Sequence, residues 1–97
     1  MASLTRLAMV FSALGNERRL KLLNAIEKGI SNPGELAKHM ELPRSTVEKH
    51  IRVLLRAELV EKVPGLGSEG QLRVSYNIRD ITRNLLEEAK KNLNIEE

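Results

Sequence analysis

Polar side chains recur at helical spacing between residues 43 and 57. Ser45, Lys49 and Arg52 fall on one side of a helix, whereas Val47 and Ile51 fall on the other. Guanidinium, ammonium and hydroxyl groups in this arrangement donate hydrogen bonds to phosphates and to the edges of nucleic-acid bases. The pattern therefore predicts a helix that packs through one side and binds a polyanion through the other.

The first two turns of this helix hold the side chains that can reach bases, namely Arg44, Ser45, Thr46, Glu48 and Lys49. Arg44 or Lys49 can donate to O6 and N7 of guanine, and Glu48 can accept from N4 of cytosine. A carboxylate near phosphates is costly without a partner, so we expect Glu48 to act mainly in specificity. Arg52 and Arg56 are better placed for the phosphate backbone. The alternative is a set of solvated residues with i,i+4 pairs such as Glu48 with Arg52.

A shorter helix is predicted directly before, over residues 33–40. Asn32 offers an N-cap acceptor, Pro33 suits the first helical position, and Glu35 completes an Asn variant of the capping box. Pro43 breaks the helical pattern, because residues that precede proline avoid the helical region. Helix, tight turn and helix in this order indicate a helix-turn-helix.

A β-ribbon is predicted after the helix-turn-helix. Two β-type runs, at residues 59–63 and 72–78, flank a glycine-rich segment at residues 64–70. We expect a two-stranded wing with a mobile tip. Arg73 begins the second strand, where one possible arrangement is a pair across the ribbon with Glu61 or Glu69.

Three further amphipathic helices are predicted, at residues 3–14, 17–28 and 79–93. Met9 and Val10 lie off the main apolar stripe of the first helix, and a small monomer cannot easily hide a second apolar surface of this kind, so it indicates a subunit interface. The first and last helices both carry wide apolar faces, which hold Leu4, Leu7, Phe11, Leu85, Leu86, Ala89 and Leu93. The alternative is that these faces only cover the core of a monomer.

Taken together, four stretches of the chain resemble the ArsR-type winged-helix repressors: ALGNERRLKLL at 13–23, ELAK at 35–38, RSTVEKHIRVL at 44–54 and LVE at 59–61. The resemblance covers nearly the whole chain. It implies a mainly α fold with a small β-ribbon, a winged helix-turn-helix of five helices plus a two-stranded wing. It also implies double-stranded DNA as partner and a homodimer in which the first and last helices pack together across a two-fold axis. The apolar side chains named above on these two helices would then form the dimer interface.

The resemblance also implies roles for individual residues. The base-contacting positions of the family map onto Arg44, Ser45, Glu48 and Lys49, and a basic residue at Arg73 approaches the minor groove or its phosphates. The predicted DNA-binding set is Arg44, Ser45, Thr46, Glu48, Lys49, Arg52, Arg56 and Arg73.

The chain departs from the family pattern at three positions. Glu41 and Glu58 stand where the family often has glycine, in the turn of the motif and just before the wing. If these positions are left-handed, each costs ~1–2 kcal/mol, and the turns then differ in detail. Leu55 stands where a polar residue is usual, and we expect it either to extend the core or to meet a partner.

No metal site is expected. Many ArsR-like proteins bind metal through cysteines before the recognition helix or through His and carboxylates on the last helix, and neither set is present. His39 and His50 are the only histidines, and two ligands are too few for a usual zinc site. We expect His50 to pack at the edge of the apolar face.

No enzyme activity and no cofactor are expected either. The sequence holds no Ser-His-Asp grouping that can be placed in one cleft and no phosphate-cradling glycine motif. Gly65, Gly67 and Gly70 match G-x-G-x-x-G only superficially, because the run leads into a strand and not into a helix.

Composition sets the remaining limits. With 97 residues the chain is expected to form a single domain, 1–97, with a modest core that a dimer would help. The net charge of +3 permits polyanion binding without requiring it. The absence of cysteine fits a reducing compartment, and no apolar run is long enough to span a bilayer. We therefore expect a cytoplasmic protein without a membrane partner.

The function predicted from these observations is sequence-specific binding of duplex DNA by a homodimeric transcription regulator, most simply a repressor at an inverted repeat. The rival hypothesis is a winged-helix adaptor or general DNA-binding protein in a larger assembly. It is favoured somewhat by five acidic residues around the presumed DNA face, Glu41, Glu48, Glu58, Glu61 and Glu69. RNA binding is a third option, but one Tyr, one Phe and no Trp provide few stacking platforms.

Overall fold

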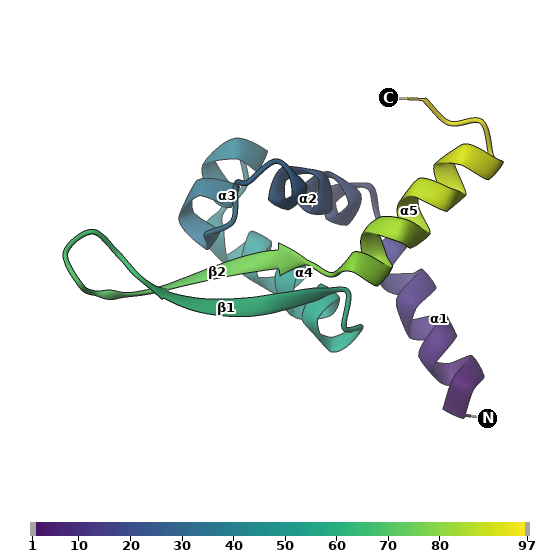
Figure 1. Ribbon diagram of the computed structural model, residues 1–97, viewed down its shortest axis with the longest axis horizontal. Helices are drawn as coiled ribbons and strands as arrows, with labels where there is room; N and C mark the ends of the chain where they lie inside the picture. Colours follow the sequence, from purple (N-terminus) through teal and green to yellow (C-terminus); the bar gives the residue numbers. More distant parts are fainter. Residues whose placement is uncertain (1, 97) are drawn as a thin grey trace.

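The computed structural model, which describes residues 2–96, has five helices and one two-stranded antiparallel sheet. Their order is α1 (Ala2–Leu14), α2 (Glu17–Glu27), α3 (Pro33–Met40), α4 (Arg44–Arg56), β1 (Val60–Leu66), β2 (Leu72–Ile78) and α5 (Asp80–Asn92). The β-ribbon projects from one side of the molecule, and α1 and α5 leave the opposite side and diverge (Figure 1). The predicted winged helix-turn-helix is confirmed.

The core lies where α2, α3 and α4 meet. Its largest fully buried apolar side chains are Leu22, Leu23, Leu36, Val47, Ile51 and Leu54. Three of these come from α4 at helical spacing, which confirms the predicted inward side of that helix. Leu55 is half-buried and packs against the same cluster, so it extends the core.

Asparagine side chains cap the starts of two of these helices, and the cap at Asn32 is the one that the sequence analysis predicts. Oδ1 of Asn16 accepts from the backbone N–H of Arg19 at 3.1 Å, and Oδ1 of Asn32 accepts from that of Glu35 at 2.9 Å. Each bond satisfies a donor that the first turn of a helix otherwise leaves free. Pro33 occupies the first helical position of α3.

Both glutamates that replace glycine adopt the left-handed conformation. Glu41 has φ of 55° and Glu58 has φ of 59°. Directly after them, Leu42 N–H donates to Ala37 O at 3.1 Å and Leu59 N–H donates to Leu54 O at 3.0 Å. These bonds are typical of Schellman motifs that end helices. The chain thus keeps a glycine-type turn at both positions, and a non-glycine residue there carries a strain of ~1–2 kcal/mol.

The first strand of the wing extends further toward the tip than the sequence analysis predicted. The paired register runs from Val60 opposite Ile78 to Leu66 opposite Leu72, so residues 64–66 belong to β1 and not to the tip. Proline usually interrupts a ladder, but β1 has a free edge where a missing N–H costs little. The tip itself is the short turn 67–71, closed by Gly67 N–H donating to Gln71 O at 2.7 Å.

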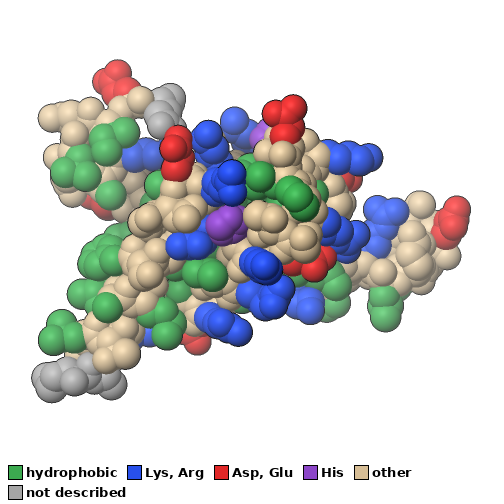
Figure 2. All heavy atoms as spheres, turned by 180° about the vertical axis from the view of Figure 1, so that it is seen from behind, with side chains coloured by type: hydrophobic (Ala, Val, Ile, Leu, Met, Phe, Trp, Pro, Cys, Tyr) green, Lys and Arg blue, Asp and Glu red, His purple; other side chains and the backbone are tan. Residues whose placement is uncertain are grey.

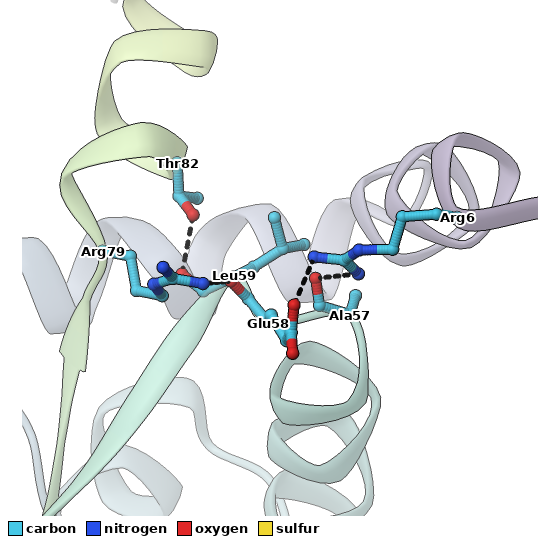
Figure 3. A network of polar contacts seen from close by, with 6 residues as sticks. All are labelled: Arg6, Ala57, Glu58, Leu59, Arg79 and Thr82. Atoms are coloured by element: carbon cyan, nitrogen blue, oxygen red, sulfur yellow. Dashed lines mark hydrogen bonds and ion pairs between the residues drawn. The ribbon is translucent and has the colours of Figure 1, made fainter. Parts of the chain in front are cut away.

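Side chains from α1 and α5 meet at the junction between α4 and β1 (Figure 3). Three consecutive carbonyls accept hydrogen bonds there: Ala57 O from Arg6 Nη1 at 2.6 Å, Glu58 O from Arg79 Nη1 at 2.9 Å, and Leu59 O from Thr82 Oγ1 at 2.7 Å. Arg6 also pairs with the Glu58 carboxylate at 2.9 Å. Both terminal helices are therefore tied to the point where the second helix of the motif ends and the wing begins.

Apart from these ties, α1 and α5 are barely covered. Ala13 is the only buried side chain of α1 among residues 3–14, and Thr82 is the only one of α5. Leu4, Phe11 and Leu93 expose 64%, 57% and 67% of their surface. The apolar faces predicted from the sequence are thus real surfaces of the single chain.

Candidate nucleic-acid interface

The polar side of α4 faces solvent. Arg44, Ser45, Lys49, Arg52 and Arg56 are exposed, and the remaining two members of the predicted α4 set, Thr46 and Glu48, are half-buried. In Figure 2, which views the molecule from behind, Lys and Arg side chains gather across the middle of the face, where α4 lies in front of the ribbon. The structure thus brings the seven predicted α4 residues together on one helix surface.

Glu48 has a different partner from the one considered in the sequence analysis. Its Oε1 accepts from Arg44 Nε at 2.9 Å, one turn earlier, and no ion pair with Arg52 forms within residues 2–96. The Arg44 and Glu48 side chains expose 64% and 43% of their surface, so the pair contributes little stability in water. Its effect is geometric, because it holds the Arg44 guanidinium at the start of the helix and gives the carboxylate a cation.

Arg44 also lies close to the first turn of α3. A Cβ atom placed on Gly34 would stand 4.0 Å from Arg44 Nη1 and 3.5 Å from the capping Oδ1 of Asn32. Helix N-termini attract anions through their free N–H groups. The start of α3 and the Arg44 guanidinium therefore create one electropositive corner beside the α4 surface.

Tyr76 borders this corner and was not singled out by the sequence analysis. It lies on β2, is buried, and its backbone N–H donates to Ser31 O at 2.9 Å before α3 begins. Burial raises the pKa of the Tyr76 hydroxyl; the charge of Glu48 adds to the increase, and that of Arg44 opposes it. Tyr76 thus links the wing to the helix-turn-helix. Its inward position in the alternation of residues 72–78 is the signal that could have indicated it.

Arg73 is exposed on β2 and faces Gly65 across the ribbon. Its side chain lies over Gly67, since a Cβ atom there would come within 2.7 Å of Arg73 Nε. Neither Glu61 nor Glu69 forms an ion pair with it in the part of the chain that the structure describes. The Arg73 guanidinium is therefore available on the wing, apart from the α4 surface.

Arg19 is a second residue that the sequence analysis did not identify. It lies on α2 and contacts α4 through His50. Its guanidinium donates to the last carbonyls of α1, Ala13 O at 2.6 Å and Ser12 O at 3.1 Å, and it lies 3.3 Å from His50 Nδ1. Burial lowers the pKa of His50, and the positive charges of Arg19 and Arg18 lower it further. His50 is half-buried at the edge of the apolar face, as expected, with its ring facing a cation.

Metal-binding clusters and membrane-spanning helices are both absent from residues 2–96. No three His, Cys, Asp or Glu side chains in that range lie close enough together to hold a metal ion. None of the helices described there is long and apolar enough to cross a membrane.

Comparison with known proteins agrees with the geometry. A family model described as "Bacterial regulatory protein, arsR family" matches residues 16–62, the segment from the cap of α2 into β1. An uncharacterised HTH-type transcriptional regulator of Methanocaldococcus jannaschii is 47% identical over 49 residues, which are 50% of this chain and 52% of that protein. The chain thus spans about half the length of this relative.

Solved structures extend the likeness to the whole fold. A homodimeric winged helix-turn-helix DNA-binding domain from Mycobacterium bovis, described as a possible ArsR-family transcriptional regulator, has a TM-score of 0.82 at 24% identity, with 96% of this chain and 82% of that chain covered. An ArsR-like transcriptional regulator from Rhodococcus sp. RHA1 has a TM-score of 0.73 at 23% identity, covering 97% and 84%. Residues 16–62 are therefore similar to arsR-family regulatory proteins, and the whole chain shares the winged-helix fold of these structures.

Proposed function

We propose that this protein is a homodimeric transcription regulator that binds duplex DNA with sequence specificity, most simply a repressor that occludes a promoter. The observation that carries the proposal is the exposed cationic side of α4, flanked by Arg73 on the wing. The match of residues 16–62 to the arsR family model supports the same function. We expect such a protein to act in the cytoplasm, where its DNA is.

Base reading is assigned to the start of α4. Arg44 and Lys49 donate to base edges, with Glu48 orienting Arg44 and accepting from a neighbouring cytosine; Ser45 and Thr46 support them. The exposed cations Arg52, Arg56 and Arg73 contact phosphates or the minor groove. This division assigns specificity to one end of the helix and general affinity to the rest.

Dimerisation is assigned to α1 and α5. Leu4, Leu7, Phe11, Leu85, Ala89 and Leu93 are exposed and Leu86 is half-buried, so burying these faces against a second copy removes apolar surface from water. Leu86 and Ala89 also line a groove of about 630 Å³ between α2 and α5, whose floor includes Leu20, Leu23 and Ile95. The partner subunit would cover this groove.

A dimer of this kind places two α4 helices in successive major grooves, about 34 Å apart. The operator is then an inverted repeat with half-sites roughly one helical turn apart. This spacing follows from the two-fold symmetry and is a geometric part of the proposal.

The adaptor hypothesis loses part of its support at the charged face. Of the five acidic residues that favoured it, Glu48 pairs with Arg44 and Glu58 pairs with Arg6. A paired carboxylate repels phosphates less than a free one, so these two residues oppose DNA binding less than the sequence suggested. In addition, an adaptor function would leave the accessible cations of α4 without a role.

Selection of bound sequences from a random duplex pool, with the mass of the protein measured in solution, tests the proposal. We expect a dimer that enriches an inverted repeat. Weak retention that is sensitive to salt, without enrichment, would indicate a general DNA-binding protein. The absence of any shift of random duplex at low ionic strength would support the adaptor.

A further inference from the structure

The wing ends in two facing leucines that nothing in the chain covers. Leu66 and Leu72 are 73% and 84% exposed, the highest fractions for large apolar side chains among residues 3–96. They form the last pair of the ribbon, directly before the turn 67–71. Figure 2 shows apolar side chains on the outer part of the projecting ribbon. Leucine is an unfavourable choice for such a site unless it meets a partner.

The register fixes the direction of this leucine pair, by which we mean Leu66 and Leu72. Side chains of directly opposite residues lie on one face of a ribbon, and that face recurs at every second pair. The leucine pair therefore shares its face with Tyr76, which is buried against the body. Arg73 lies on the opposite face. The pair thus continues the inward face of the wing past the edge of the helices, and the buried Tyr76 anchors its orientation relative to α4.

The chemistry around the leucine pair narrows the choice of partner. A stable protein interface buries on the order of 1,200 Å² or more, and the turn that surrounds the pair offers only Gly67, Ser68, Glu69, Gly70 and Gln71. Two leucines at the end of a thin ribbon are, however, suited to a minor groove, where proteins insert Leu, Ile, Phe or Pro beside or between base steps. Arg73 on the other face supplies the cation that such a narrow, negatively charged groove attracts.

We propose that the leucine pair is an apolar wedge that enters the minor groove flanking the half-site and opens a flexible base step there. The inference rests on the proposed function, since the wedge acts only when α4 holds the protein on duplex DNA. Its contribution is an apolar contact with sugars and base faces, so it strengthens binding without releasing counterions. Pyrimidine–purine steps such as TA unstack at least cost, so they are the preferred flank.

The test uses the full chain and a duplex that carries the selected site, with 2-aminopurine in a flanking TA step. The fluorescence of this base rises when it unstacks. The variants are Leu66→Ala with Leu72→Ala, the conservative Leu66→Met with Leu72→Met, and Asn77→Ala as a control that truncates an exposed side chain near the other end of β2. Affinity is measured over a range of salt concentrations, and the mass of each variant is determined alongside.

We expect the double alanine variant to bind about tenfold more weakly, to lose the fluorescence increase and to keep the wild-type salt slope. The methionine variant and Asn77→Ala keep affinity and fluorescence. Wild-type affinity and fluorescence in the double alanine variant would overturn the wedge while leaving DNA binding intact. A drop in the mass of the double alanine variant would overturn it in favour of contact between copies. If the wild-type protein binds no duplex at all, both the wedge and the proposed function fail.

Discussion

Arg19 Nη1 lies 3.3 Å from Nδ1 of His50, across the interface between α2 and α4. A guanidinium has donors and no acceptor, so the Nδ1 atom it contacts must be unprotonated. The same guanidinium holds the end of α1 through Ala13 O. A neutral His50 therefore adds a polar contact between α4 and α2 to the apolar packing of α4.

The first prediction concerns pH. His50 has a lowered pKa in the folded chain and an ordinary value of about 6.5 when unfolded. Between the two values the unfolded chain binds more protons, so acid favours unfolding. We expect the free energy of unfolding to fall as the pH drops below about 6.5, and to stop falling from this cause below the folded pKa. Denaturant titrations at several pH values measure it.

His50→Gln should remove this part of the pH dependence, because glutamine keeps an acceptor near Arg19 and does not titrate in this range. His39→Gln is the matched control, since it removes the other imidazole, an exposed one on α3. A His50→Gln protein whose stability still falls with acid as steeply as the wild type would contradict the assignment.

The second prediction concerns the left-handed glutamates. Glu41→Gly should raise the free energy of unfolding by about 0.5–1 kcal/mol, because removing the Cβ strain outweighs the added entropy of the unfolded chain. Glu58→Gly should raise the free energy of unfolding by a smaller amount, since it also removes the ion pair with Arg6. Thermal unfolding measures both.

Glu41→Ala provides the control for this prediction. It removes the carboxylate but keeps the Cβ atom, so the strain at a φ of 55° remains and no gain is expected. Equal stabilisation by alanine and glycine would show that the charge of Glu41, and not its backbone, is unfavourable.

The helices and the α4 surface were predictable because the signals lie within the elements themselves. Asn16 and Asn32 cap their helices through bonds to residues three positions on, and the inward side of α4 repeats at helical spacing. The left-handed positions at Glu41 and Glu58 were anticipated from the family resemblance, because the family often has glycine there. Local rules of this kind act over a few residues.

The contacts that join distant parts of the chain could not be predicted in this way. Arg6 reaches Ala57 across 51 positions and Arg19 reaches His50 across 31, and no spacing rule pairs such residues. The first strand of the wing was expected to end at residue 63, because proline and glycine, here Pro64 and Gly65, usually interrupt strands. The free edge of β1 tolerates both residues. Exposed edges relax sequence rules that hold inside a sheet.

The third prediction concerns the support of Arg73 on the wing. A Cβ atom at Gly67 would overlap the Gln71 amide and approach Arg73 Nε, both at the flexible ends of side chains. Gly67→Ala should therefore displace the Arg73 guanidinium while changing the free energy of unfolding by less than about 0.5 kcal/mol. The salt slope of duplex binding should move toward that of Arg73→Ala.

Gly65→Ala is the matched control on the same ribbon, because its nearest atom would be Arg73 O at an ordinary 4.0 Å. Wild-type DNA binding is expected for this variant. If Gly65→Ala and Gly67→Ala weaken binding alike, the position of Arg73 over Gly67 does not matter for the interface.

The fourth prediction separates base reading from phosphate contact on α4. Arg44→Ala and Lys49→Ala should each cost about 1–3 kcal/mol on the selected site and relax specificity, because they remove donors to base edges. Arg56→Ala should instead weaken all sequences alike and reduce the salt slope by about 1. Glu48→Gln, which releases Arg44 from its carboxylate partner, should relax specificity without reducing that slope. Competition binding against random duplex distinguishes the two roles. If Arg44→Ala, Lys49→Ala and Arg56→Ala each lose affinity equally on specific and random DNA, α4 contacts phosphates alone.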